Sequence, residues 1–476
     1  MPMPTKSSIR LCSILPPAAN TLLENTESPH LIRLILPILH HIKHLRLYRV
    51  TLDQFDELWR TTTPENFAKL ESVDFFVYNR VSAPITSYDG SWWANITPFR
   101  LARNLRSVII GCEDLGSRQL ALLLLSMDFP WSQISFLDIS RIPRSSPTLV
   151  ASCIKNCTAL QKLAINQLKA ESDSEAGFDF LSDALRRLRG LHSLTVEAVA
   201  NLDEAQSFVL HDLNPPTSLP LRAMPSDVWA RLSFLDLTDS DMEGSLLRRI
   251  LKECRQLIKF ASTVPCLSNK SSAYAVGRDI SLPHLTAMYI RGIEDSWIFQ
   301  SLLVPALDQL ELIFETDFDF DASAVRQMIK SSGCSLLDFE CSLISDLEPP
   351  CYLHGLHGIL EAIPTARRVH MGDGILLDED ISSKVARGEM LPCVEEVAWE
   401  SARPFLFLQM IEDRVEWELK TRGHVVLQRY SRTRGGQGGK VQDDCYHALE
   451  KKYGLYCPEW YIDEGYGHFI NQLRRR

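Results

Sequence analysis

The stretch CTALQKLAINQL, from Cys157 to Leu168, carries apolar side chains at Leu160, Leu163, Ile165 and Leu168. The spacing L-x-x-L-x-I indicates a short strand, because alternate side chains of a strand face the same side. One copy does not distinguish an isolated amphipathic segment from one unit of a repeated structure. The rest of the chain therefore decides what this stretch means.

The same spacing recurs along most of the chain. Thirteen copies begin between residues 42 and 394, at a mean step of about 29 residues, the upper end for leucine-rich repeats. Single steps vary from 22 to 41 residues, so the array is irregular. In chain order the copies are IKHLRL from Ile42, LESVDF from Leu70, LRSVII from Leu105, ISFLDI from Ile134, LQKLAI from Leu160, LHSLTV from Leu191, LSFLDL from Leu232, LIKFAS from Leu257, LTAMYI from Leu285, LDQLEL from Leu307, LLDFEC from Leu336, ARRVHM from Ala366 and VEEVAW from Val394.

The segments between these copies have the pattern of helices. GSLLRRILKECRQL (residues 244–257) and DASAVRQMIKSSGCSL (residues 321–336) each place their apolar side chains on one helical face, and Gly333 stands where a helix should stop. A strand, a turn and a helix in each unit predict an α/β leucine-rich-repeat solenoid of about 13 irregular repeats, curved into a horseshoe. The segments FLFLQMIEDRVEWELK and HVVLQRY predict a final helix and strand that close the array.

The spacing of the repeats, and the places where it breaks, also predict the domain organisation of the chain. We expect an irregular segment over 1–29, the solenoid over 30–429, and insertions near 76–104 and 198–231. In residues 430–476, the stretch SRTRGGQGGKVQDD from Ser431 predicts a flexible linker before an aromatic and basic tail.

Composition limits the classes of function. The formal net charge of −10 argues against general nucleic-acid binding, which normally shows a basic footprint, although the arginines of the tail leave RNA binding as a distant alternative. The most apolar run, LIRLILPIL from Leu31, is too short to span a membrane, and no secretory signal is evident. We therefore expect a cytoplasmic or nuclear protein whose 12 cysteines, such as Cys254 and Cys341, are reduced.

Three phrases of the sequence carry a family resemblance. PWSQISFLDI (residues 130–139), SGCSLLDF (residues 332–339) and LPHLTAM (residues 282–288) resemble repeats of the F-box-like proteins of mushroom-forming (basidiomycete) fungi. The resemblance covers roughly residues 30–430. It implies substrate recognition for an SCF-type ubiquitin ligase, with the Skp linker and a cullin as partners.

The chain departs from that family at its start. The F-box pattern L-P-x-E-[IL]-x-x-x-I does not precede Ile42. The Skp linker and cullin are therefore expected as partners only if an F-box exists in the full-length product. The alternative is a stand-alone leucine-rich-repeat interaction scaffold with no ubiquitin link.

The residues between the core leucines of each copy should face the concave surface of the solenoid. In the later copies five of them are acidic (Glu311, Asp338, Glu340, Glu396 and Glu400), against the single Arg368. A concave surface of one sign predicts a protein target with a basic surface, while the alternative is a set of ordinary solvated side chains. The predicted partner-binding residues are Tyr289, Glu311, Asp338, Glu340, His370, Glu396 and Glu400.

A second candidate contact is the pair Trp92 and Trp93 on the first insertion. Exposed aromatic side chains on loops are enriched among the anchors of protein interfaces. The alternative is that both indoles cover the open end of the hydrophobic core.

Chemistry of other kinds has weak support. The residues Cys351, His354 and His357 lack a fourth metal ligand, and in GGQGGK (residues 435–440) Val441 stands where a phosphate loop needs Ser or Thr. We predict no catalytic residues, no metal and no cofactor. The same holds for a set in the tail whose spacing matches no zinc pattern, namely Cys445, His447, Cys457 and His468.

Overall fold

The structure, a computed structural model, divides into two compact units, Met1–Leu232 (unit 1) and Ser233–Arg476 (unit 2). The structure describes part of the residues of the chain. These are 20–24, 36–51, 58, 61–78, 99–113, 129–142, 147–166, 175–197, 225–238, 244–263, 279–292, 296–314, 322–343, 353, 355–372, 374–399, 404–430 and 448–455.

Unit 1 is an array of parallel strands, in which each of β1 to β6 pairs with the next strand along the chain. Short 3-10 helices and α-helices connect the strands. The strands are β1 (Asn20–Glu24), β2 (His44–Thr51), β3 (Ser72–Tyr78), β4 (Ser107–Glu113), β5 (Phe136–Ile139), β6 (Lys162–Asn166) and β7 (Ser193–Glu197). The helices are η1 (Leu36–His41), η2 (Pro64–Phe67), η5 (Trp131–Gln133), α4 (Pro147–Ile154), α5 (Glu175–Arg187) and α7 (Ser226–Trp229).

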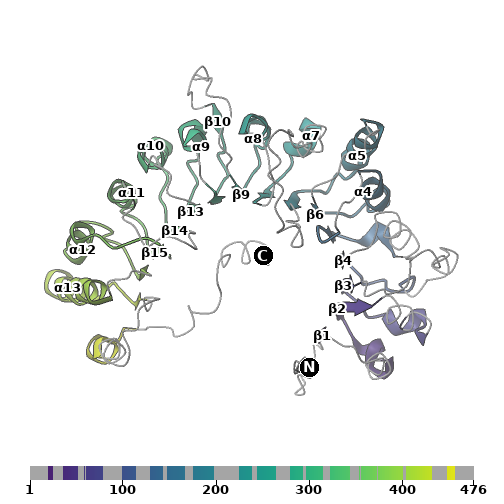
Figure 1. Cartoon of the computed structure of the whole chain (residues 1–476), viewed down its shortest axis with the longest axis horizontal. Coiled ribbons are helices and arrows are strands. Elements are labelled where there is room, and N and C mark those ends of the chain that lie inside the picture. The colour runs from purple at the N-terminus through teal and green to yellow at the C-terminus, as the bar shows by residue number, and fades with distance from the viewer. Residues whose placement is uncertain are drawn as a thin grey trace, which may run out of the picture. The chain divides into compact units, whose positions relative to one another are not determined.

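Unit 2 continues the same pattern, with its helices along one side of a parallel sheet (Figure 1). The sheet strands are β8 (Phe234–Leu237), β9 (Lys259–Thr263), β11 (Ala287–Arg291), β13 (Gln309–Phe314), β14 (Asp338–Leu343), β15 (Arg368–Met371), β16 (Glu396–Trp399) and β17 (Arg429–Tyr430). The helices are α8 (Gly244–Glu253), α9 (Trp297–Ser301), α10 (Ala322–Ser332), α11 (Leu356–Ala362), α12 (Glu379–Ala386) and α13 (Pro404–Arg422). A separate two-stranded sheet pairs β10 (Ile280–Ser281) with β12 (Leu302–Leu303).

The repeat prediction is confirmed at the level of single strands. Each of the thirteen predicted segments contains a strand, and CTALQKLAINQL forms β6 with Leu160, Leu163 and Ile165 buried. The final helix and strand are α13 and β17, and Gly333 ends α10 with a φ of 62°. The chain is an α/β leucine-rich-repeat protein.

Parallel pairing keeps equivalent side chains of successive repeats in register, which builds the core. In unit 1, Leu137, Leu163 and Leu194 are register partners on neighbouring strands, and all three are buried. Burying a leucine side chain contributes about 1.5–3 kcal/mol, so a continuous row of them stabilises the stack where one repeat would not fold alone. In unit 2, the side chains of Cys254 and Cys341 are buried in the equivalent core, as predicted.

In the early repeats of unit 1, short 3-10 helices form part of the connections between strands. They include η2 and η5, of 4 and 3 residues. Large aromatic side chains fill the space beneath them, with ring centroids of Phe67 and Phe99 5.1 Å apart and those of Phe99 and Phe129 4.6 Å apart. These buried rings therefore form part of the core of the early repeats.

The end of unit 2 is closed by α13 and by part of the tail. Residues 448–453 are helical and dock on α13. Lys452 Nζ lies 2.7 Å from a carboxylate oxygen of Glu412, and the hydroxyl of Tyr453 donates to Glu416 over 3.0 Å. This part of the predicted linker and tail is thus packed against the last helix of the array.

Candidate protein-binding site

The side of the unit 2 sheet away from its helices, called here the helix-free face, carries those of the predicted partner-binding residues that the structure describes. Strand register places Tyr289, Glu311, Glu340 and His370 side by side in one row, on β11, β13, β14 and β15. The sequence pattern predicts this alignment, because each residue stands at the same position of its L-x-x-L-x-L copy.

The prediction that this row is exposed is wrong for its first two residues. Tyr289 is only 3% exposed and Glu311 only 2%. Tyr289 belongs to a buried cluster with Ala261 and Ile313, of which Ile313 stands two residues beyond Glu311 on β13 and therefore faces the same side. Strand alternation predicts which side a residue faces, but not whether its neighbours cover it.

Burial gives Glu311 unusual electrostatics. Loss of water contact raises the pKa of the Glu311 carboxyl well above its ordinary value, the neighbouring Glu340 raises it further, and His370 opposes the shift. Oxygen Oε2 of Glu311 accepts no hydrogen bond from any residue that the structure describes. His370 Nδ1 lies 3.1 Å from Glu340 instead. Burial likewise raises the pKa of the Tyr289 phenol, and Glu311 adds to that shift.

We expect Glu311→Gln to stabilise the protein at neutral pH, because the amide keeps the shape of the carboxyl group but carries no charge to be removed from water, and each unit by which burial raises the pKa corresponds to about 1.4 kcal/mol. The folded state holds the Glu311 proton more tightly than the unfolded chain does, so unfolding releases a proton above the ordinary pKa of about 4.3. Stability should therefore fall as pH rises from about 4.3 towards the raised pKa, and this fall should vanish in the variant.

Urea unfolding of both proteins at several pH values from 4 to 8 measures this difference. The same change at the partly exposed Glu395 serves as the control, with an expected effect below about 0.5 kcal/mol at every pH. If Glu311→Gln is less stable than the parent at pH 8, the buried carboxylate has a stabilising partner and this account of it is wrong.

A groove of about 380 Å³ lies where strands β13 to β17 begin. The first residue of each strand and the residue before it line the groove, and strand register aligns them. Leu337 is its only exposed large apolar residue among the described residues, at 38% exposure. We call it the strand-start groove, formed by Asp308, Gln309, Leu337, Asp338, Arg367, Arg368, Glu395, Glu396, Gln428 and Arg429.

From β14 to β17, charges in the strand-start groove form stripes that alternate in sign from one strand to the next. A negative stripe of Asp308 and Asp338 is followed by a positive one on β15, a negative one on β16, and Arg429 on β17. Ion pairs join the stripes: Arg368 pairs with Asp338, and an Arg429 nitrogen lies 3.9 Å from Glu396. Burial raises the pKa of the Asp308 carboxyl, and the nearby Asp338 raises it further.

The groove adds basic side chains to the mainly acidic set that the sequence predicts for the concave surface. Asp338 and Glu396 do stand in the groove, but Arg367 and Arg429 add two positive charges that the count along the sequence did not include. The phrase HVVLQRY (residues 424–430) continues the repeat spacing and could have predicted Arg429 at this surface. The last of the thirteen copies begins at Val394, so Arg429 was not among the predicted residues. The electrostatic pattern is mixed, with four acidic and three basic side chains.

Several predicted residues lie outside the described part of the chain. Glu400, Trp92 and Trp93 are among them, so their roles stay predictions. Of the weak metal candidates only His357 is described, at the start of α11. Within the described ranges no group of three or more His, Cys, Asp or Glu side chains is arranged to hold a metal ion, and no helix has the length and apolar character to cross a membrane.

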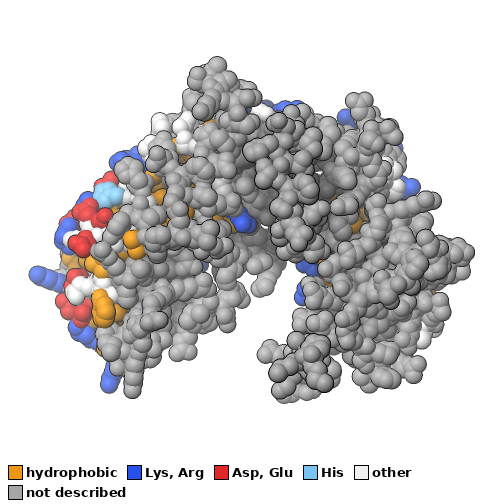
Figure 2. Space-filling view, in the orientation of Figure 1, with side chains coloured by type: hydrophobic (Ala, Val, Ile, Leu, Met, Phe, Trp, Pro, Cys, Tyr) orange, Lys and Arg blue, Asp and Glu red, His pale blue; other side chains and the backbone are white. Residues whose placement is uncertain are grey.

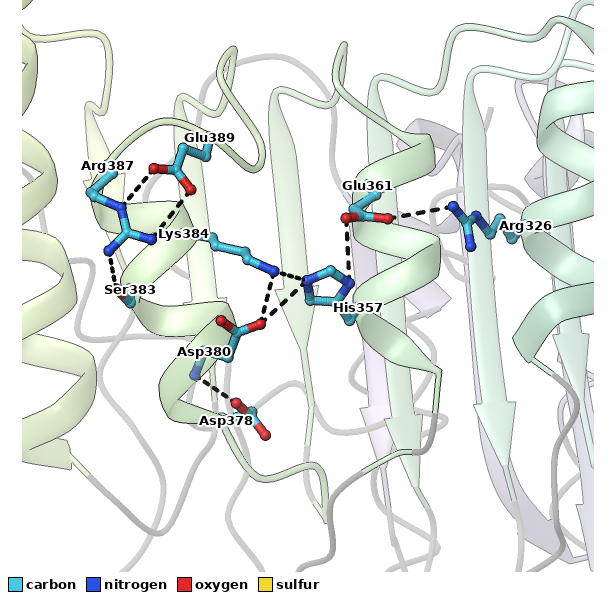
Figure 3. Close-up of polar contacts among 9 residues, drawn as sticks. All are labelled: Arg326, His357, Glu361, Asp378, Asp380, Ser383, Lys384, Arg387 and Glu389. Carbon is cyan, nitrogen blue, oxygen red and sulfur yellow. Dashed lines mark hydrogen bonds and ion pairs between the residues drawn. The ribbon is translucent and has the colours of Figure 1, made fainter.

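The opposite side of unit 2 carries a chain of exposed ion pairs between successive helices (Figure 3). Arg326 on α10 lies 3.5 Å from Glu361 on α11, and Lys384 on α12 lies 2.6 Å from His357 and 2.9 Å from Asp380. Acidic, basic and histidine side chains appear together over this part of the surface in Figure 2. Exposed pairs of this kind each contribute about 0–1 kcal/mol, so we assign them to helix packing.

Comparison with known proteins supports no closer assignment. No protein-family model matches the sequence, and no curated protein matches it. Solved structures with a similar fold include the leucine-rich-repeat-containing protein LegL7 of Legionella pneumophila, with 15% identity, a TM-score of 0.36, and 66% of this chain and 96% of that one covered.

Two further structures are similar in the same sense. A leucine-rich-repeat protein of Leptospira interrogans has 12% identity and a TM-score of 0.34, covering 90% of this chain and 98% of its own. The complex of Rad7 and Elc1 in yeast has 10% identity and a TM-score of 0.36, with 78% of each chain covered. Structural similarity at this level supports no inference about function. The fold assignment rests on the repeats themselves.

Proposed function

We propose that the protein recognises another protein through the helix-free face of unit 2, with the strand-start groove as the main contact. The observation that supports this most directly is the groove itself, in which side chains from five successive strands are aligned by register and remain reachable. The Arg368 and Arg429 side chains are 60% and 56% exposed. Arginine is enriched at protein interfaces, and patterned charge sets the specificity and speed of association.

A finer proposal follows from the resemblance to F-box-like proteins. The captured protein would be a substrate of an SCF-type ubiquitin ligase, held near the enzyme so that the local concentration of reacting groups rises. The second candidate is a stand-alone interaction scaffold, which the same groove would serve without any ligase. We further propose a cytoplasmic or nuclear site of action and no catalytic activity of the chain itself.

The double variant Arg368→Glu/Glu396→Arg tests the role of the groove. It removes the alternation of the stripes but keeps the net charge, and it leaves opposite charges at register-paired positions of β15 and β16, so folding should be preserved. We expect partners enriched by proximity labelling of the product tagged at its native locus to fall about tenfold, which corresponds to a loss of about 1.4 kcal/mol.

The matched control is Arg326→Glu/Glu361→Arg, which reverses an exposed pair on the helix side of the same unit. It should leave the labelled partners unchanged. Equal labelling by the parent and the groove variant would contradict recognition through the groove. Recovery of the Skp linker and a cullin with the parent separates the ligase proposal from the scaffold.

A further inference from the structure

The spacing of the charged stripes constrains the shape of the partner. Neighbouring strands of a sheet lie about 4.8 Å apart, so the sign of the groove changes about every 5 Å and repeats about every 10 Å. The relevant row runs across the strands through Asp338, Arg368, Glu396 and Arg429, which are consecutive register partners. A partner that matches all four must place opposite charges along one face at this short spacing.

An α-helix meets this requirement. Residues three or four apart lie on one helical face, separated along the axis by about 4.5–6 Å. An extended strand places side chains on one face only about every 6.7 Å, so they do not stay aligned with charges about 5 Å apart. A polyproline II helix repeats one face about every 9.3 Å, so it matches stripes of one sign and leaves the other sign without a partner.

Other charge patterns are disfavoured by the same stripes. A uniformly basic segment would place positive charges over Arg367 and Arg368, and a nucleic-acid backbone would place phosphates over Glu395 and Glu396. Like charges in contact repel each other. Either partner would therefore be repelled at one stripe and attracted at the next, and the two contributions to the binding energy oppose each other. The exposed Leu337 within the groove additionally offers an apolar contact of the kind that interface cores contain.

We infer that the strand-start groove receives an α-helix of a partner protein, laid across strands β14 to β17, whose groove-facing side chains alternate in charge about one turn apart. Basic side chains of that helix face Asp338 and Glu396, and acidic ones face Arg368 and Arg429. Each exposed pair contributes little by itself, but four pairs in a fixed order exclude helices with the wrong pattern. This inference rests on the proposed function and specifies the partner of the same site.

The test is a selection of random 20-residue peptides displayed on phage against the full chain, with counter-selection on Arg368→Glu/Glu396→Arg. We expect the enriched sequences to carry opposite charges at spacings of three or four residues. A different result would be peptides that bind the parent but not the variant and carry charges of a single sign, or like charges every third residue. That result would overturn the helical inference and leave recognition by the groove intact. Equal enrichment on the parent and the variant would overturn both.

Two synthetic peptides of identical composition then measure the effect. Both are alanine-rich helices with two lysines and two glutamates on one face, alternating in one peptide and arranged as a lysine pair followed by a glutamate pair in the other. Fluorescence anisotropy should show about tenfold tighter binding of the alternating peptide to the parent chain. On the double variant, whose stripes are grouped by sign like the charges of the second peptide, this preference should reverse, and equal binding of the two peptides to the parent would contradict the inference.

Discussion

Replacing Arg414 with methionine should destabilise unit 2 by about 3–5 kcal/mol, because it leaves a buried carboxylate without its partner. Arg414 and Glu418 are almost fully buried on α13, and Arg414 Nε donates to Glu418 over 2.7 Å. The remaining guanidinium nitrogens of Arg414 donate to the carbonyl oxygens of Val385, Leu391 and Pro392. The Arg414 side chain thus joins α13 to α12 and to the connection between α12 and β16.

The partner carboxylate extends this network to the last strand of the groove. Oxygen Oε2 of Glu418 accepts hydrogen bonds from the backbone N–H groups of Val426 and Leu427, at 2.6 and 3.1 Å. These residues immediately precede β17, which carries Arg429. We therefore expect Arg414→Met to weaken binding at the groove as well as stability.

Thermal and urea unfolding of the full chain measures the loss, and Arg422→Met is the matched control. Arg422 also donates to Pro392 and lies over the Trp417 ring, but it is exposed, so its replacement should cost less than about 1 kcal/mol. The double variant Arg414→Met/Glu418→Leu should lose less stability than the sum of its single variants, because it removes both buried charges. Equal effects of the Arg414 and Arg422 changes would contradict a buried ion pair.

Gly388→Ala is expected to cost about 2–5 kcal/mol of stability. Gly388 follows α12 with a φ of +67°, a conformation that costs a residue with a Cβ atom about 1–2 kcal/mol. A methyl group there would also lie less than 3.0 Å from three ring carbons of Trp417. The guanidinium groups of Arg414 and Arg422 lie 5.1 and 5.2 Å from the centre of that ring, which restricts its movement, and such overpacking costs about 1–3 kcal/mol.

Gly423→Ala separates these two contributions. Gly423 has a φ of +74°, but no neighbouring atom lies within 4 Å of the position that a methyl carbon would occupy there, so only the backbone cost applies. The melting temperature should fall clearly further for Gly388→Ala than for Gly423→Ala. Equal shifts would show that Trp417 yields to the methyl group at little cost.

The repeats and their phase were predictable from the sequence. Buried leucines alternate with outward residues in every L-x-x-L-x-L copy, so one strand predicts the orientation of the next, and the alignment of Tyr289, Glu311 and Glu340 followed. Burial within that row was not predictable, because it depends on side chains such as Ala261 and Ile313 that meet Tyr289 only in the folded sheet.

The alternating stripes also depend on distant parts of the chain. Arg368 lies beside Asp338 and Glu396 only because strands about 30 residues apart in sequence become neighbours, so counting acids along the chain suggested a surface of one sign. The pattern of a single copy gives the charge of one strand. The order of charges across the sheet can be predicted only when every copy is included, also the one that forms β17.

The sequence by itself determined the leucine-rich-repeat fold, the positions of its strands and the side of the sheet that each residue faces, because these follow from local periodicity. Only the tertiary structure decided that Arg414 and Glu418, spaced like an ordinary surface pair of a helix, are buried, and that Glu311 carries an unsatisfied carboxylate oxygen among the described residues. Burial and electrostatic environment are properties of the packed neighbours, and those neighbours come from other repeats.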